Sequence, residues 1–178
     1  PPVKSSPALS LKNQPKPGIN TRKVALLALP GVSGSDVDAL RGALSGQGAK
    51  VEVVSLALGP LRTAEGRPID VERTFLTTAS VLYDAVVVPG GASAKLLAES
   101  ADAIHWVRES FRHGKPIGAA NEGVAVLVAA ALPRTELARA KSHHAVVASH
   151  GVVSVVAQDL SAFAAAFTEA LRAHHELR

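Results

Sequence analysis

Short apolar runs alternate with amphipathic stretches along most of this chain. Residues 24–29 and 85–88 are continuous apolar runs, which are typical of strands buried on both faces of a parallel sheet. After the first run, Val37, Leu40 and Leu44 recur at helical spacing. Because strands and helices continue to alternate, the pattern predicts an α/β fold with a doubly wound parallel sheet and helices on both faces.

The same pattern places the remaining strands. We expect strands at residues 51–58 and 116–120, and one or two more within residues 146–156. A small hairpin at the edge of the sheet is expected over residues 61–71, with Glu65-Gly66 inside it.

Three further helices complete the prediction. One follows Gly91, and its expected apolar face comprises Leu96, Leu97, Ile104, Val107 and Phe111. Another covers residues 124–131. A final helix near the C-terminus is expected to be capped by Asp159 or Ser161.

The first part of the chain departs from this alternation. Residues 1–22 carry five prolines among Ser, Lys and Asn, and so many prolines prevent a regular hydrogen-bonded ladder. We therefore expect residues 1–22 to be a linker or arm, and residues 23–178 to form one domain. Since the chain begins with Pro1 rather than Met, we also expect a further region to precede it in a longer parent protein.

Composition narrows the classes of function. Of the 178 residues, 47% are hydrophobic and 19% are charged, which is a globular balance. The net charge of +4 comes from scattered Lys and Arg without interleaved aromatic residues, so nucleic-acid binding is not indicated. The apolar runs are far shorter than the ~20 residues that span a bilayer, and no signal-peptide pattern opens the chain. No membrane contact and no particular compartment are therefore indicated.

Cysteine and methionine are both absent. Without Cys, disulfides, thiolate metal sites and cysteine nucleophiles are excluded. The seven histidines form no metal-ligand spacing, and no phosphate-binding loop, G-x-G-x-x-G or G-x-S-x-G motif occurs. The lack of both easily oxidised residues fits either chance in an Ala-rich chain or a protein that works near oxidants.

Candidate site residues gather where strands are expected to end. Ligand sites in such sheets lie at the carboxyl ends of the strands, where residues 31–36, Gly90-Gly91 and Asn121-Glu122-Gly123 converge. The two adjacent glycines either point amide groups at a ligand or simply form a tight strand-to-helix turn. Glu122 is either an acid or base, if it is buried, or a carboxylate that complements a helix N-terminus.

Residues 117–124 have the layout of a nucleophile elbow, in which a strained residue follows a strand and precedes a helix. The central residue is Asn121, and a carboxamide is not a competent nucleophile. We therefore expect the elbow geometry without its reacting atom.

Several segments together resemble a known superfamily. They are Thr21-Arg22-Lys23-Val24-Ala25, the stretch from Tyr83 to Gly91, Gly114-Lys115-Pro116-Ile117 and the elbow. In this order they are similar to the class I glutamine amidotransferase-like superfamily, which includes the intracellular-protease-like proteins. The segments 6–11 and 103–109 and the closing helix up to His174-His175 resemble, more specifically, the C-terminal domain of large-subunit catalases.

The resemblance implies what the site has lost. Active members of the superfamily carry Cys at the elbow, a neighbouring His, and an acidic residue after the first strand. Here Asn121 stands at the Cys position and Glu122 at the His position, and Asp36 is the nearest match to the acidic residue. Thiol-dependent activity is therefore not expected, and Gly90, Gly91 and Gly123 would line a vestigial pocket with no catalytic residue.

For the catalase domain, the resemblance implies a non-catalytic domain of flavodoxin-like fold on the outside of a haem-containing tetramer. Its partners would be the catalase core of the same chain, the other subunits and, in a chaperone-like role, unfolded client proteins. Catalases bind haem iron through a Tyr preceded four residues earlier by Arg, whereas Ala79 precedes Tyr83, the one tyrosine. We therefore expect no cofactor in this chain and haem in its parent, which would decompose hydrogen peroxide.

Two other classes of function remain open. One is a small-ligand-binding module that uses the pocket around Gly90, Gly91, Asn121 and Glu122. The other is a stand-alone protein of the intracellular-protease-like superfamily, either a pseudo-enzyme or a residual enzyme with Glu122 as general base.

Overall fold

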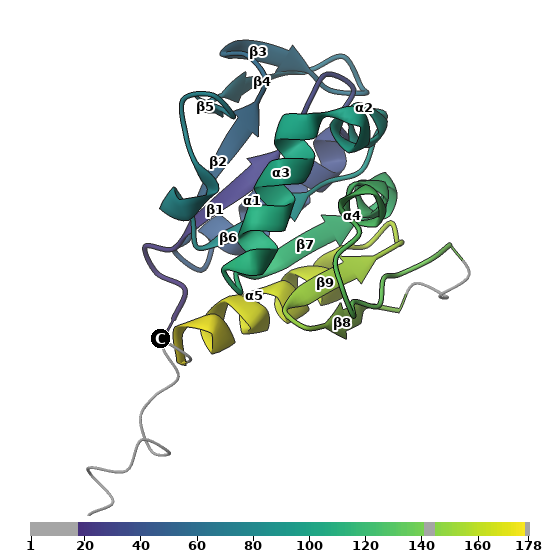
Figure 1. Cartoon of the computed structure of the whole chain (residues 1–178). Helices are drawn as coiled ribbons and strands as arrows, with labels where there is room; N and C mark the ends of the chain where they lie inside the picture. Colours follow the sequence, from purple (N-terminus) through teal and green to yellow (C-terminus); the bar gives the residue numbers. More distant parts are fainter. Residues whose placement is uncertain (1–17, 141–144, 177–178) are drawn as a thin grey trace, which may run out of the picture.

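A mostly parallel sheet forms the centre of the molecule (Figure 1). The computed structural model describes residues 18–140 and 145–176, so residues 1–17 of the linker expected over residues 1–22 lie outside the described residues. Within that part, the strand order is β5 (Arg73–Thr74), β2 (Lys50–Ser55), β1 (Lys23–Leu27), β6 (Ala85–Val88), β7 (Ile117–Ala120), β9 (Val152–Val155) and β8 (Val147–Ser149). The neighbours pair in parallel, except that β8 runs antiparallel to β9.

Helices cover both faces of this sheet, as the sequence pattern predicts (Figure 1). The helices are α1 (Gly34–Ser45), α2 (Ser93–Glu99), α3 (Ala101–Arg112), α4 (Val124–Ala130) and α5 (Ser161–Glu176). One apolar cluster joins α1 and α5 to the first face, and a second joins α2, α3 and α4 to the other. The central strands β6 and β7 are buried along their whole length, which is why they appear in the sequence as unbroken runs of small and apolar residues.

The expected small hairpin is present. It consists of β3 (Gly59–Arg62) and β4 (Pro68–Val71), which pair antiparallel as a separate two-stranded sheet. In Figure 1 the hairpin lies beyond the end of β2. Because Val32 forms isolated bridges to Thr63 and to Gly91, the hairpin lies beside the loops at the carboxyl ends of the strands.

The helix expected after Gly91 is in fact two helices. Ser100 takes an extended conformation between α2 and α3, and its Oγ accepts a hydrogen bond from the Ala103 amide, so it ends one helix and caps the next. Leu96 in α2 is 47% exposed, so it departs from the expected apolar face, whereas Leu97 and Val107 are fully buried.

Two boundaries also differ from the sequence pattern. Strand β2 ends at Ser55, and Leu58 beyond it is largely exposed. Ile19, within the expected linker, is only 1% exposed and belongs to the core cluster on the α1 and α5 side. Within residues 18–140 and 145–176, every helix falls short of the length and apolar character needed to cross a membrane.

Candidate functional site

The structure brings the predicted residues of the elbow together at the carboxyl ends of β1, β6 and β7. Asn121 directly follows β7 and begins the short 3-10 turn η4 (Asn121–Gly123), which leads into α4. Its φ of +53° lies in the left-handed region, which only Gly, Asn and Asp adopt readily. The backbone thus makes the sharp strand-to-helix turn that an elbow requires, with a carboxamide at its apex.

Both ends of the Asn121 side chain are engaged. Its Nδ2 donates to Oδ2 of Asp36 at 3.0 Å, and its Oδ1 accepts from the Ala157 amide at 2.9 Å. Asp36 lies in the first turn of α1, and Ala157 lies between β9 and α5. Asn121 therefore ties together three loops that are far apart in the sequence.

Asp36 is the most buried of these polar residues, with 7% of its surface exposed. Its Oδ2 also accepts from the Gly90 amide at 2.9 Å, and its own amide donates to Oγ of Ser33, the N-cap of α1. One carboxylate oxygen thus joins the loop after β6 to the elbow.

Glu122 is exposed, and its Oε2 accepts from the Gly91 amide at 2.8 Å. A Cβ placed on Gly90 would lie 2.5 Å from this Oε2 and 2.8 Å from Oδ2 of Asp36. Two carboxylates therefore approach the glycine backbone closely, and a side chain at position 90 would require both of them to shift.

The neighbouring glycines are needed for backbone packing. Gly91 has a φ of +97°, and its added Cβ would lie 2.4 Å from the Ser33 amide nitrogen. Gly123 packs against the end of β6, since its added Cβ would lie 2.3 Å from the Val88 carbonyl oxygen. Of the two roles that the sequence left open for the glycines, these contacts favour the tight turn.

The sequence did not indicate that Glu65 belongs here. Glu65 lies in the turn of the β3–β4 hairpin, and its two carboxylate oxygens accept from the Gly34 amide at the start of α1. Hydrogen bonds from its own amide, from the Thr63 hydroxyl and from the Gly34 amide hold the pKa of Glu65 below its ordinary value. Only the folded position of the hairpin reveals this contact, because no local motif marks it.

These groups line an open pocket of about 580 Å³. Its lining comprises Ser33, Ser35, Asp36, Ala64, Glu65, Gly91, Asn121, Glu122, Ala157 and Gln158. Three carboxylates and no basic side chain belong to this set. No group of three or more metal-ligating side chains occurs among the described residues.

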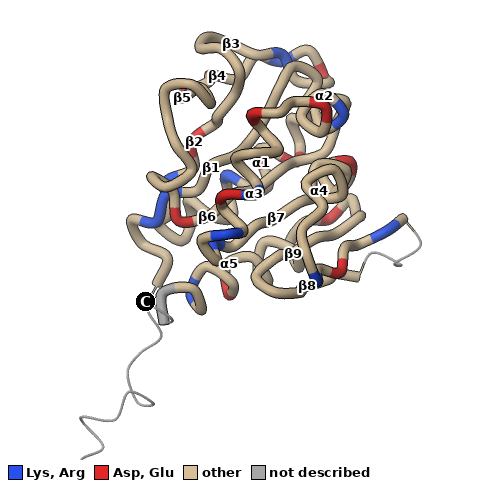
Figure 2. The backbone as a smooth tube through the Cα atoms, viewed as in Figure 1, with Lys and Arg blue, Asp and Glu red and all other residues tan. Residues whose placement is uncertain are grey.

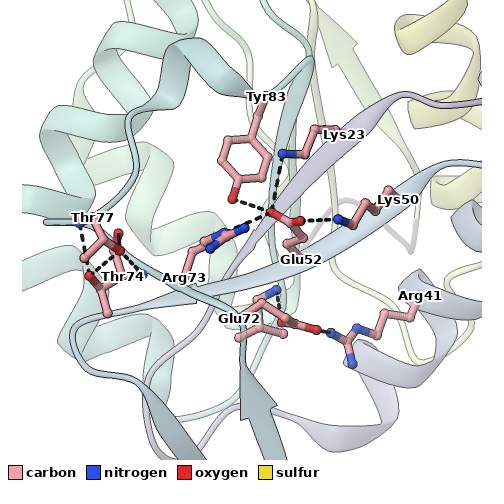
Figure 3. A network of polar contacts seen from close by, with 10 residues as sticks. Lys23, Arg41, Lys50, Glu52, Glu72, Arg73, Thr74, Thr77 and Tyr83 are labelled. Atoms are coloured by element: carbon pink, nitrogen blue, oxygen red, sulfur yellow. Dashed lines mark hydrogen bonds and ion pairs between the residues drawn. The ribbon is translucent and has the colours of Figure 1, made fainter.

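A second polar cluster lies inside the sheet, centred on Glu52 of β2 (Figure 3). The side chain is 3% exposed, and its oxygens lie 2.7 Å from Nζ of Lys50, 3.7 Å from Nζ of Lys23 and 3.9 Å from Nε of Arg73. The Tyr83 hydroxyl donates to Oε2 at 2.8 Å. A lone Glu in the run from Val51 to Val54 is a signal that sequence reasoning missed.

The surroundings shift both titrating groups of this second cluster. Burial opposes ionisation of Glu52, but hydrogen bonds from Lys50 and Tyr83 and the charges of Lys23 and Lys50 outweigh it, so the pKa of the carboxyl lies below its ordinary value. Burial, together with the hydrogen bond to Glu52, raises the pKa of Tyr83. The arrangement stabilises a charged Glu52 and a neutral Tyr83.

Comparison with solved structures agrees with this fold. A ThiJ/PfpI domain protein from Brachyspira murdochii superposes with a TM-score of 0.73, covering 90% of this chain and 99% of its own, at 16% identity. A Schizosaccharomyces pombe DJ-1 mutant gives a TM-score of 0.70, covering 88% of this chain and 98% of its own, also at 16% identity. The fold is thus the flavodoxin-like one that was expected.

Comparison with protein families is more specific. The model of the C-terminal domain found in long catalases matches residues 20–177. Catalase-2 of Bacillus subtilis is 35% identical over 97% of this chain, and catalase HPII of Pseudomonas aeruginosa is 37% identical over 75% of it. These matches cover only 23% and 19% of the two relatives, so the chain spans about a fifth of their length. The chain belongs to the family of C-terminal domains found in long catalases.

Proposed function

We propose that this chain is a non-catalytic domain of a longer, haem-containing catalase, in which it packs against the catalase core and stabilises the oligomer. The observation that carries the proposal is the state of the elbow. Its apical residue, Asn121, has no nucleophilic atom, and both ends of its side chain are held by hydrogen bonds to Asp36 and Ala157. The geometry of an active site is retained as a structural link.

The position of Glu122 supports the same proposal. The sequence allowed Glu122 to act as an acid or base only if it were buried, whereas the side chain is exposed and its Oε2 accepts from the Gly91 amide. This favours a role for Glu122 in holding the loop after β6 over the residual-enzyme alternative.

The surroundings of Tyr83 support the assignment of haem to the rest of the longer protein. Catalases bind the haem iron through a tyrosine oxygen. The Tyr83 hydroxyl is buried and donates to Glu52, and its pKa is raised, so the ionised oxygen that would bind iron is disfavoured. This residue does not fit the role of haem ligand.

A domain exchange tests the proposal. Catalase-2 of Bacillus subtilis would be prepared intact, without its C-terminal domain, and with that domain replaced by this chain. We expect the truncated protein to lose its oligomer and its activity at lower temperature than the other two, with equal peroxide turnover per haem before heating. Equal thermal inactivation of the truncated and exchanged proteins would contradict the structural role. Peroxide decomposition or a Soret shift on haem addition in the isolated chain would contradict the absence of catalysis.

An exposed apolar surface favours a second role, the chaperone-like one. Leu76, Val81 and Leu82 are 87%, 66% and 59% exposed, and they line one hollow beside α3. Such a surface is suited to binding the apolar segments of an unfolding protein. Suppression of client aggregation by the isolated chain, and its loss in Leu76→Ser, would support this role; no suppression at equimolar ratio would exclude it.

A further inference from the structure

The amides beside the elbow are occupied by the chain's own carboxylates. In an elbow site, free amides and a helix N-terminus stabilise a negative charge that develops on the nucleophile or on the substrate oxygen. Here the Gly90 amide donates to Asp36 and the Gly91 amide donates to Glu122. Both glycine amides, which could otherwise donate to an anionic ligand, are thus already paired with carboxylates of the chain itself.

The charges around the pocket act in the same direction. Asp36 comes from α1, Glu122 from η4 and Glu65 from the hairpin turn, and each of them lines the pocket. Arg67 lies outside this lining, and its Nη2 lies 2.6 Å from Oδ2 of Asp38 and donates to the Gly34 carbonyl oxygen. Like charges at such short range disfavour any further negative charge.

We propose that Glu122 forms a built-in block on anion chemistry at the elbow, by occupying the Gly91 amide and placing a negative charge beside the apex. The site is then disabled twice: its reacting atom is missing, and its surroundings oppose the thiolate that such a site needs. A thiol introduced at position 121 would therefore remain protonated at pH 7. This inference concerns the pocket alone and is independent of the role in the oligomer.

The chain offers a clean test because it contains no cysteine. In Asn121→Cys the new thiol is the sole one, so alkylation by iodoacetamide, in which the thiolate displaces iodide, reports on that position alone. The rate would be measured against pH, because the midpoint of the profile gives the thiol pKa independently of steric access. The same variant unfolded in urea supplies the reference profile.

We expect the folded Asn121→Cys thiol to titrate above the unfolded reference. Adding Glu122→Gln should lower the midpoint by about one pH unit, a roughly tenfold faster alkylation at pH 7. The matched control is Glu65→Gln, which removes the same charge from the pocket wall but leaves the Gly91 amide paired, and it should shift the midpoint by less. A midpoint at or below the unfolded reference, or one that Glu122→Gln does not move, would overturn the proposal.

A second readout leaves Asn121 in place, in case the cysteine variant does not fold. In isotope-labelled wild-type protein, the Gly91 amide resonance should move on acidification, and in Glu122→Gln this movement should disappear. If the chemical shift of the Gly91 amide in the wild type does not change with pH, the Glu122 carboxylate does not accept from that amide, and the proposal is contradicted.

Discussion

At the scale of single residues, Asn121 is the clearest case of a side chain selected by backbone geometry. Among L-residues, Asn tolerates the left-handed conformation at low cost, and its carboxamide offers both a donor and an acceptor. Both are used, toward Asp36 and toward the Ala157 amide. The residue at the apex of the elbow thereby fixes the elbow, the start of α1 and the β9–α5 loop relative to one another.

Two substitutions separate these contributions. Asn121→Gly keeps the positive φ but loses both hydrogen bonds, so we expect a loss of about 1–3 kcal/mol in the free energy of unfolding. Asn121→Ala should lower the free energy of unfolding by about 1 kcal/mol more than Asn121→Gly does, because the left-handed conformation is less favourable for Ala than for Gly. Urea unfolding measures both.

The control for backbone strain is Ala131, which ends α4 with a φ of +49°. Ala131→Gly relieves the same strain without a change in side-chain bonding and should stabilise the protein by roughly 0.5–1 kcal/mol. Equal stability of Asn121→Gly and Asn121→Ala would show that strain at the elbow is not important.

At the scale of elements, the sequence predicts most of the helices and strands, because these depend on the local pattern of apolar residues. The strands β1, β6 and β7 follow from unbroken runs of small and apolar residues. The separation of α2 from α3 depends on the extended backbone of Ser100, which the helical spacing of Leu97 and Val107 conceals. The contact between Glu65 and the start of α1 joins residues 31 positions apart, and so it exists only in the folded chain.

The packing of α5 on the sheet gives an element-scale prediction. A Cβ added at Gly118 of β7 would lie 2.9 Å from the Phe163 ring and 3.0 Å from the Phe167 ring, both fully buried. Gly118→Ala should therefore destabilise the protein by about 1–3 kcal/mol through overpacking. Phe163→Leu should lower the free energy of unfolding less in the Gly118→Ala background than in the wild type. Urea unfolding of the wild type, the two single variants and the double variant measures this difference. Additive losses in the free energy of unfolding would show that α5 and β7 are not overpacked at this contact.

At the scale of the whole molecule, most charged residues are dispersed over the surface, and one buried carboxylate joins several of them. Figure 2 shows Lys and Arg interspersed with Asp and Glu along the fold. Glu52 is buried, as Asp36 and Lys115 are, and it joins cations from β1, β2 and β5 to Tyr83, which precedes β6. Three of the seven strands of the main sheet are therefore linked through one carboxylate.

This link predicts how global stability depends on pH. Since folding lowers the pKa of Glu52 below its ordinary 4.5, its contribution is present above pH 4.5 and is lost as the pH falls through the folded value. Glu52→Gln should be less stable at pH 7 by about 1–3 kcal/mol, and its free energy of unfolding should fall less on acidification. Parallel pH profiles of the two proteins would contradict the prediction. Glu169→Gln, which removes an exposed carboxylate paired with Arg172, is the control and should change little.

Both borders of the main sheet end in very short strands, β5 with two residues and β8 with three. A long, flat border strand is a template on which another chain can continue the hydrogen-bonded ladder. Neither border strand provides one, although most residues of the strands between them are apolar. The fold thus keeps a sheet rich in Val and Ala from growing by strand addition between molecules, even where many copies are held close together.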